Sequence, residues 1–541
     1  MPIFDFDKKT QEIINKSFIS VQKTNWKSWL TLNSIKDYEE LIIKNAGLSS
    51  VDNFYEKIEK ETANSTYYIK DLNQFLKENL RSNPLILCHT SGTTNSNLEA
   101  LKWFNMTEEI VKRFWAPGMQ AIFESSGLNL HNSAVIFVPS RLYTDGIQSF
   151  GGQEYLSLYS SEFSQRIMLT SIKPESYLLN EYKNSKHLAI ISQILSMENI
   201  AVISAPAITI LGWANPEKLK EGIRKSLATV QDFPLTQTLE YLLKLVEEEG
   251  LNTATSIIQS KLSEKLQKAT IVFSISSLSK SNWVLIRKFM NWEDGKEKFT
   301  NLYIASEIGP IASSLGDYKV SRSNLMYIFP LFLPMLKYRN KIEFITNSSF
   351  KTGKLLISKT ENGKPLLNVN IGDVISVESQ EILPLIHGKI LRSSFKLKYP
   401  IKLNDSIKTP ENYSVHAGDY FECKSFDLIE PRNLIYCLNE KLKSNIDSMV
   451  FLISSNEEDS QKRFIIPVDR AQFKEDIFFE CLSSNSLIRE IKSNKVSIKL
   501  DSNKIVQYLE DREELLEKVR KGTLPKGILK KWPLYVILPQ K

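Results

Sequence analysis

The chain has 541 residues, 42% of them hydrophobic and 24% charged, and a formal net charge of +7. Such a length exceeds what one simple core can organise and predicts two or three domains. Lys and Arg are spread along the chain, and no run of about 18 apolar residues is free of charge, so we expect neither a nucleic-acid partner nor a membrane span.

Apolar runs and helical patterns alternate through the first part of the chain. Helical periodicity dominates the first ~80 residues and ends at an apolar run, residues 85–88, which is typical of a buried strand. Further apolar runs at 134–138, 200–204 and 270–273 alternate with helical patterns at 216–228 and 239–249. This alternation predicts an α/β protein whose largely parallel sheet is covered by helices and binds ligands at the carboxyl ends of its strands.

The sequence pattern changes at about residue 341, where the predicted strands become short and frequent. We therefore expect a small antiparallel subdomain, followed by a last segment, residues 398–541, that mixes strands with a charged helix at 504–520. Gly522 and Pro525 follow that helix, as expected of a helix end.

Cysteine usage and the start of the chain indicate the compartment. Cys88, Cys423, Cys437 and Cys481 form no CxxC pair, and the first residues lack the apolar core of a signal peptide. We expect reduced thiols in a cytoplasmic protein without a structural zinc site. The five histidines have no metal-ligand spacing, and none is predicted to act as a base.

A hydroxyl-rich turn follows the first predicted strand. It contains Thr90, Ser91, Gly92, Thr93 and Thr94. Glycine lets the backbone wrap closely around a ligand, and the hydroxyl and N–H groups are donors suited to a polyphosphate. A Ser/Thr-rich turn without function fits this segment equally well when it is taken alone.

Three later segments carry groups that a nucleotide site needs. Tyr303 can stack on a purine, and Glu307, next to Ser306, can help to hold Mg²⁺. Asp373, after Gly372, can accept the hydroxyls of a ribose. Each has a commoner structural explanation when taken alone, such as an Asp in a β-turn.

Basic residues complete the pattern. Lys389 and Arg392 lie close behind Asp373, and lysines including Lys530 follow the G-T-L-P stretch at 522–525. A lysine on a loop can bring a point charge to a reacting phosphate, although exposed cations are most often only solvated.

Taken in this order, the segments resemble the adenylate-forming superfamily of acyl-CoA synthetases, peptide-synthetase adenylation domains and luciferases. Residues 90–94 match the first five positions of the TSGTTG phosphate loop. Tyr303, Ser306 and Glu307 match the Y-G-x-T-E motif with Ser in place of Thr, and Gly372 with Asp373 matches the ribose motif. The G-T-L-P stretch with Lys530 looks most like the phenylacetate-CoA ligase branch and its acyl-protein synthetase relatives.

The resemblance implies two domains and a reaction. A large N-terminal adenylation domain, residues 1–395, would bind ATP and a carboxylic acid, and a small mobile α+β domain, residues 396–541, would act as a lid. The carboxylate attacks the α-phosphate of ATP, forming an acyl-adenylate and pyrophosphate. The acyl group then passes to the thiol of coenzyme A or of a carrier protein.

Residue roles follow from the same resemblance. The turn from Thr90 to Thr94 would hold phosphates, and Glu307 with Ser306 would support Mg²⁺. Tyr303 would stack on adenine, and Asp373 would hold the ribose. Lys389 or Arg392 would assist, and Lys530 would bridge the carboxylate and the α-phosphate.

The acid pocket is expected along residues 139–152 and 205–213. Tyr143, Phe150 and Trp213 could build an apolar or aromatic wall. They could equally be core residues, which is the commoner fate of such side chains.

Two departures from the family pattern keep alternatives open. Asn95 replaces the glycine that closes the loop, and the lysine expected nearby comes only at Lys102. One alternative is an acyl-amido synthetase with an amine acceptor. Another is a catalytically impaired member that still binds nucleotide. A P-loop NTPase is excluded because GxxxxGK[ST] is absent from the sequence.

Overall fold

The computed structural model describes the chain except for a set of short segments and a few longer ones. These are residues 1–8, 11, 15–20, 48–85, 91–100, 140–144, 151, 182–185, 274–277, 279, 339–340, 362–363, 380, 398–400, 404–412, 423–426, 429–430, 445, 454–461, 483, 502–505, 509–511, 522, 524–531 and 540–541.

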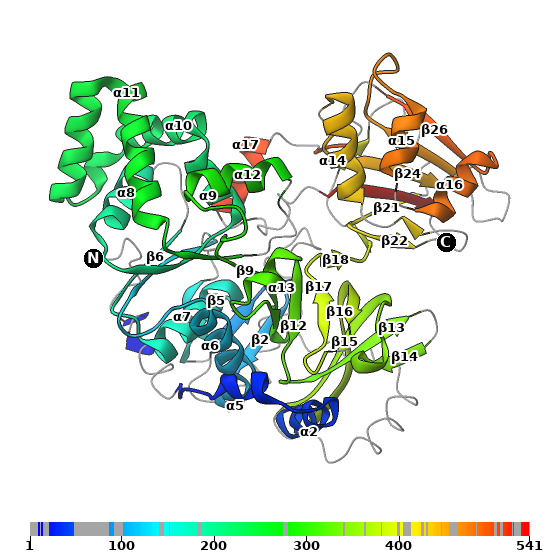
Figure 1. Ribbon diagram of the computed structural model, residues 1–541, viewed down its shortest axis with the longest axis horizontal. Helices are drawn as coiled ribbons and strands as arrows, with labels where there is room; N and C mark the ends of the chain where they lie inside the picture. The colour runs from blue at the N-terminus through cyan, green and yellow to red at the C-terminus, as the bar shows by residue number, and fades with distance from the viewer. Residues whose placement is uncertain are drawn as a thin grey trace.

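A five-stranded parallel sheet lies in the N-terminal region (Figure 1). Its strands run in the order β6 (Ser176–Glu181), β3 (Ser133–Val138), β7 (Ile200–Ser204), β8 (Thr270–Val272) and β9 (Phe299–Thr300). In β3, Val135 and Phe137 enter one hydrophobic core, whereas Ala134 and Ile136 enter another. Burial on both faces explains the unbroken apolar runs. The predicted α/β class with a helix-covered parallel sheet is confirmed.

Helices cover both faces of this sheet. One face packs against α8 (His187–Ser196), α9 (Ala207–Ala214), α10 (Pro216–Leu227), α11 (Gln237–Leu266) and α12 (Lys280–Phe289). The other face packs against α6 (Ala116–Ser125) and α7 (Ser160–Ile172). Helix α6 is buried along its length, which suits its nearly all-round apolar sequence. The helix expected at 239–249 is part of the longer α11, which is kinked at Gly250.

The strand before the hydroxyl-rich turn, β1 (Ile86–His89), belongs to a different sheet. It lies between β2 (Trp103–Met106) and β5 (Gln153–Tyr159), and β4 (Gly146–Phe150) pairs with β5. Only the β1–β5 pairing is parallel. A short apolar run predicts a buried strand but cannot show which strand it pairs with.

A nine-stranded antiparallel sheet follows in the chain. Its order is β10 (Leu302–Ala305), β11 (Gly309–Ser313), β12 (Leu325–Ile328), β17 (Leu385–His387), β16 (Lys364–Ser379), β15 (Thr352–Glu361), β13 (Leu333–Tyr338) and β14 (Lys341–Phe344), with β18 (Leu391–Arg392) paired to β16. Phe299 and Tyr303 lie in two successive strands of different sheets, β9 and β10. The antiparallel region begins earlier than the composition suggested.

Short elements complete the N-terminal region. They are η1 (Trp26–Thr31), α2 (Ile35–Ala46), α5 (Glu108–Ile110), η3 (Val111–Trp115), η5 (Val230–Asp232), α13 (Tyr318–Arg322) and η7 (Ile345–Asn347). Elements η1 and α2 bury Trp26, Trp29 and Tyr38 against the same core as α6.

A separate lobe carries the C-terminal sheet (Figure 1). Its order is β19 (Phe395–Lys396), β21 (Tyr413–Gly418), β28 (Leu534–Pro539), β24 (Met449–Ile453), β25 (Lys462–Ile466) and β26 (Val496–Leu500). Helices α14 (Pro431–Leu442), α15 (Glu475–Cys481) and α16 (Asn485–Lys492) cover one face, and Leu515 of α17 (Arg512–Arg520) packs on the other. Strand β18 still belongs to the nine-stranded sheet, whereas β19 belongs to the C-terminal sheet.

The helix expected over residues 504–520 is shorter than predicted. Val506–Tyr508 forms β27, which pairs with β20 (Ile401–Leu403), and the described helical part of this stretch is α17. A second small ladder joins β22 (Phe421–Glu422) to β23 (Asp427–Leu428). Pairing with a strand about 100 residues away overrides the local helical pattern.

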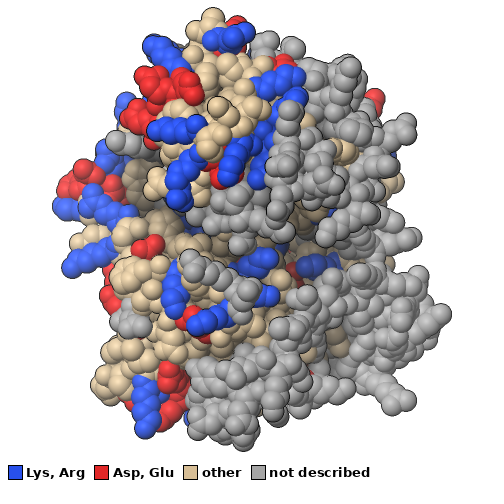
Figure 2. All heavy atoms as spheres, turned by 90° about the vertical axis from the view of Figure 1, so that its right-hand side faces the viewer, with Lys and Arg blue, Asp and Glu red and all other residues tan. Residues whose placement is uncertain are grey.

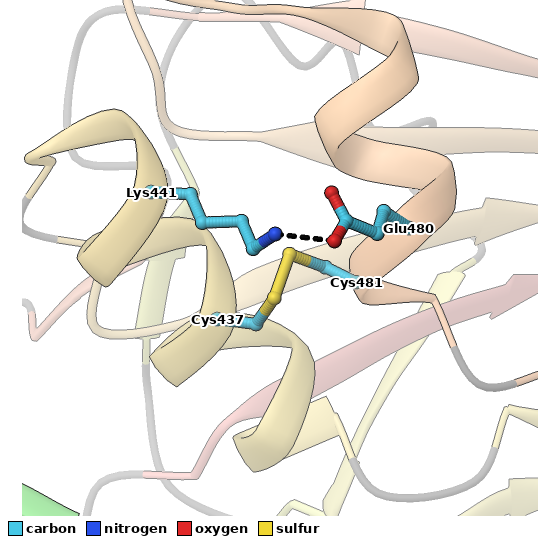
Figure 3. The surroundings of a disulfide bond; sticks show 4 residues. All are labelled: Cys437, Lys441, Glu480 and Cys481. Atoms are coloured by element: carbon cyan, nitrogen blue, oxygen red, sulfur yellow. Dashed lines mark hydrogen bonds and ion pairs between the residues drawn. A yellow bond between two sulfur atoms is a disulfide. The ribbon is translucent and has the colours of Figure 1, made fainter.

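The prediction of reduced cysteines is wrong for two of the four. Cys437 of α14 and Cys481 of α15 form a disulfide, and Lys441 and Glu480 form an ion pair beside it (Figure 3). The partners are 44 residues apart in sequence, a separation that no spacing rule identifies. Cys88 is a free, buried thiol, and Cys423 lies outside the described residues. Disulfides are uncommon in reducing compartments, so this bond argues against the cytoplasmic prediction.

Across the described residues, every helix is too short or too polar to cross a bilayer.

Candidate active site

The base of the predicted phosphate loop is tied to β2. The Thr90 N–H donates to the Lys102 carbonyl at 3.1 Å, which closes the segment between them. Ser91, Gly92, Thr93, Thr94 and Asn95 lie outside the described residues. The structure therefore shows where this segment begins and ends.

A buried histidine anchors the same base. His89 Nε2 lies against Asp145 Oδ1, and both side chains are fully buried. His89 Nδ1 lies 3.0 Å from the Thr90 carbonyl oxygen, and the ring packs near Trp103 and Tyr159. The His–Asp pair thus links the end of β1 to the segment just before β4. The sequence offered no sign of Asp145.

Lys102 pairs with one of the predicted site residues. Its ammonium donates to Glu307 Oε1 at 3.0 Å, and the two side chains are 25% and 12% exposed. The residue that comes late in the loop sequence therefore reaches the predicted magnesium carboxylate. A lysine supplies a compact charge with three donors, which suits a phosphate.

A glycine bulge places the predicted ribose carboxylate. The β15–β16 register shifts between the Lys354–Val374 and Leu356–Asn370 pairs. Gly372 has φ +82°, and a Cβ there would come within 2.5 Å of the Arg392 guanidinium. Only glycine accepts both the backbone conformation and the close approach. Asp373 therefore lies in a strand and not in the β-turn that was the alternative.

Asp373 joins two of the predicted residues. Tyr303 donates its hydroxyl to Asp373 Oδ2 at 2.6 Å, and Arg392 Nη1 lies 3.1 Å from Asp373 Oδ1. Burial first, and then the Asp373 charge, raise the pKa of Tyr303 well above its usual value, so the phenol stays protonated.

Arg392 also reaches toward the C-terminal lobe. Its guanidinium donates to the Ile371 carbonyl, and its backbone N–H donates to Asp419 Oδ2 at 3.3 Å. Asp419 is itself held by Arg432 of α14 at 3.0 Å. Of the two basic residues predicted to assist, the structure brings Arg392 to Asp373, whereas the Lys389 backbone N–H donates to His387 Nδ1.

A cavity of about 310 Å³ is lined in part by Leu302 and Ile304, the two neighbours of Tyr303 in β10. Ser306 is in its wall and shares a 2.7 Å hydrogen bond with Ser160. Ser160 and Ser161 begin α7, whose N-cap residue, Tyr159, makes no side-chain cap. The dipole of a helix start favours an anion.

The predicted acid-pocket segments contribute in part. Pro139, Ala205 and Pro206 line the cavity. Trp213 does not, because it is fully buried in the core, where it meets Phe137 edge-on. Tyr143 and the side chain of Phe150 lie outside the described residues. Ser160, Ser164 and Gln165 were missed, since nothing in an amphipathic helix pattern distinguishes a cavity-lining face from a core-facing one.

The predicted lysine of the C-terminal tail, Lys530, lies outside the described residues. Thr523 of the G-T-L-P stretch is described, and both its N–H and its hydroxyl donate to the Lys518 carbonyl at 2.9 Å. This bond closes the end of α17 ahead of the lysine-bearing segment.

The described residues offer few protein ligands for Mg²⁺. The described residues contain no group of three or more His, Cys, Asp or Glu side chains that could hold a metal. Glu307 offers one carboxylate, already paired with Lys102. This arrangement fits Mg²⁺ held mainly by nucleotide phosphates and water, as is usual for that ion.

The charge of the surrounding surface suits an anionic substrate. Figure 2 shows the side on which the C-terminal lobe lies above the nine-stranded sheet. Lys and Arg side chains gather near the middle of the described part of this face (Figure 2). A positive field of this kind raises the local concentration of polyanions.

Comparisons with known proteins gave structural matches only. No family model and no curated protein matches the chain. Among solved structures, it is similar to the acyl acid amido synthetase AtGH3.15 in complex with 2,4-DB, with 14% identity, coverage of 97% of this chain and 98% of that one, and a TM-score of 0.49. It is also similar to an open conformation of 2-hydroxyisobutyryl-CoA ligase in complex with 2-HIB-AMP and CoA, with 9% identity, 77% and 75% coverage, and a TM-score of 0.41. A third match is the amide bond synthetase McbA from Marinactinospora thermotolerans, with 10% identity, 71% and 62% coverage, and a TM-score of 0.33. By their names, these proteins are an acyl acid amido synthetase, a CoA ligase and an amide bond synthetase.

Proposed function

We propose that the chain is an ATP-dependent ligase that activates a carboxylic acid as an acyl-adenylate and releases pyrophosphate. One observation carries the proposal. Strand β10 and the turn after it place Tyr303 on Asp373, Glu307 on Lys102, and Ser306 in the wall of the cavity. A nucleotide site and an acid pocket therefore share five consecutive residues.

The acid is proposed to lie in the cavity with its carboxylate toward the start of α7. There the dipole of α7 and the Ser160–Ser306 hydroxyls would favour the carboxylate without a fixed cation. A carboxylate held by neutral donors keeps its charge available for attack on phosphorus.

The adenosine is proposed to lie along the Tyr303–Asp373–Arg392 cluster. Asp373 accepts hydrogen bonds from the ribose, and Arg392 holds Asp373 in place. Tyr303 presents its ring to adenine while its hydroxyl remains on Asp373.

In the proposed reaction, a carboxylate oxygen bonds to the α-phosphorus, and the bond from that phosphorus to the bridging oxygen breaks. Pyrophosphate leaves with the bonding electrons, so negative charge grows on it in the transition state. Lys102 lies where it can donate to this charge, and Glu307 keeps it there. Magnesium, when bound by Glu307 and the phosphates, neutralises further charge.

Three parts of the proposal rest on the sequence resemblance. Residues 90–94 would hold the phosphates through N–H and hydroxyl donors. Lys530 would bridge the carboxylate and the α-phosphate. Residues 396–541 would form a mobile lid that carries Lys530, and the phenylacetate-CoA ligase branch remains the nearest model for the tail.

For the second half-reaction we propose a thiol acceptor, on coenzyme A or on a carrier protein. An amine acceptor is the alternative outcome of the same assay. A cytoplasmic site of action also belongs to the proposal, although the Cys437–Cys481 disulfide argues against it.

The test is ATP–pyrophosphate exchange against a panel of carboxylic acids, with products trapped by coenzyme A, a carrier-protein thiol or amino acids. Acid-dependent exchange is expected, and the Glu307→Gln variant should reduce it. ATP binding without exchange for any acid would contradict the proposal and favour an impaired nucleotide-binding protein.

A further inference from the structure

The wall of the acid cavity contains an unusual number of hydroxyl groups. Its polar members come mostly from α7 and the ends of neighbouring strands: Tyr159, Ser160, Ser161, Ser164, Gln165, Ser204 and Ser306. Apolar side chains fill the rest of the wall, with Phe137 and Phe273 the largest. The described residues of this wall include no Asp, Glu, Lys, Arg or His.

The charged residues nearest on α7 pair with each other. Glu162 and Arg166 form a buried ion pair at 2.8 Å one turn apart, and neither lines the cavity. The described wall therefore offers a second charged group on the substrate no counter-ion. Neutral polar groups, in contrast, find many partners there.

Among the described residues of the cavity wall, Gln165 has a buried polar atom that forms no hydrogen bond. It is 7% exposed, and its Nε2 makes one weak contact of 3.5 Å with Ser204 Oγ. Its carbonyl oxygen, Oε1, is buried and accepts no hydrogen bond from any described residue. A buried acceptor without a donor costs free energy, which a ligand recovers if it supplies the donor.

The cavity is also small. Its volume, about 310 Å³, lies near the lower end of the range for ligand pockets. Ile304 lines it at the position where the Y-G-x-T-E motif has glycine. A branched side chain in place of a hydrogen atom reduces the space next to Ser306.

We infer that the substrate is a small monocarboxylic acid that carries a hydroxyl group, which donates a hydrogen bond to Gln165 Oε1 beside Ser204. This inference rests on the proposed function and names its substrate class. Gln165 is then a specificity residue: it distinguishes the hydroxylated acid from the same acid without the hydroxyl, because only the former fills the buried acceptor.

The test uses pairs of acids that differ by one hydroxyl. Suitable pairs are butanoate with its 2-, 3- and 4-hydroxy forms, and 3-phenylpropanoate with its 2-hydroxy and 4-hydroxyphenyl forms. For each acid, kcat/KM is measured by ATP–pyrophosphate exchange in the full-length protein. At least one hydroxylated acid should exceed its parent by about tenfold or more.

The Gln165→Leu variant keeps the bulk of the side chain and removes the acceptor. It should lower the hydroxylated-to-parent ratio of kcat/KM about tenfold, whereas Gln193→Leu, the same change on α8 outside the cavity, should leave the ratio unchanged. A ratio cancels any general loss of folded enzyme. Both variants replace a glutamine with leucine, so a ratio that falls equally in both would refute the role of Gln165.

The possible outcomes distinguish a failure of the inferred substrate class from a failure of the proposed function. Exchange that is equally fast with every parent and hydroxylated acid overturns the inference and leaves the proposed function standing. Exchange with no acid at all overturns both. Faster exchange with the amino or dicarboxylic analogues of these acids than with the hydroxylated ones also overturns the inference.

Discussion

Replacing Lys102 with methionine tests the central electrostatic feature of the site. At the observed Nζ–Oε1 separation of 3.0 Å and an effective dielectric constant of about 20, the attraction between the two unit charges is about 5.5 kcal/mol before desolvation is subtracted. Hydrogen bonds to charged groups contribute about 1.5–3 kcal/mol net. Since pyrophosphate would take the place of Glu307 as the main acceptor in the transition state, Lys102→Met should slow exchange about 10- to 150-fold.

The assay is acid-dependent ATP–pyrophosphate exchange at saturating acid, followed as kcat/KM for ATP. Lys351→Met is the matched control, because Lys351 pairs with Glu343 at similar exposure (33% and 23%) on the antiparallel sheet, away from the cavity. Lys102→Arg should restore part of the rate, since it keeps the charge but not the compact geometry. Exchange in Lys102→Met within about twofold of the unmodified protein would refute the reasoning.

Four further outcomes are expected. Asp373→Asn removes the charge that Tyr303 and Arg392 share, so the KM for ATP should rise about tenfold or more while the acid KM changes little; equal changes in both would contradict the ribose role. His89→Phe removes the buried contact with Asp145 and should cost about 1–3 kcal/mol in the free energy of unfolding measured with urea. Tyr303 has a raised pKa in the folded state, so ionisation of the unfolded chain above pH about 10 should lower stability; Tyr303→Phe should make the alkaline part of the pH–stability curve shallower, and an unchanged slope would count against the assignment. Lys530→Ala should abolish exchange but retain ATP binding in calorimetry, and unchanged exchange would remove Lys530 from the reaction.

The sequence predicted the local elements more reliably than their pairing. The apolar run at 200–204 became β7 with the same bounds, because a strand buried on both faces leaves a continuous signal. The run before the phosphate loop also became a strand, yet it joined a separate sheet, since partner choice depends on contacts far along the chain. Residues 506–508 were expected to be helical and became β27 for the same reason.

The candidate site could be predicted where a motif names the residue, and not where geometry assembles it. Tyr303 and Asp373 are 70 residues apart in sequence and meet through one hydrogen bond, while their role at a nucleotide stays a prediction. Gln165 and Ser160 were not foreseen, because Ser and Gln on a helix carry no distinctive pattern. From the sequence, Lys102 was evident only as a lysine farther from the phosphate loop than the family motif has it. Its contact with Glu307 is evident only from the structure.

If residues 396–541 form the mobile lid proposed above, Arg392 couples two equilibria. Its side chain holds Asp373 at the nucleotide cluster, while its backbone N–H holds Asp419, which Arg432 ties to α14 of the C-terminal lobe. A ligand that shifts this arginine acts on the placement of the lobe by an amount equal to its difference in affinity for the two placements. By thermodynamic reciprocity, a partner that holds the lobe must change the affinity for that ligand by the same factor. Nucleotide titrations carried out with and without a bound acyl acceptor would therefore measure one coupling constant from either direction.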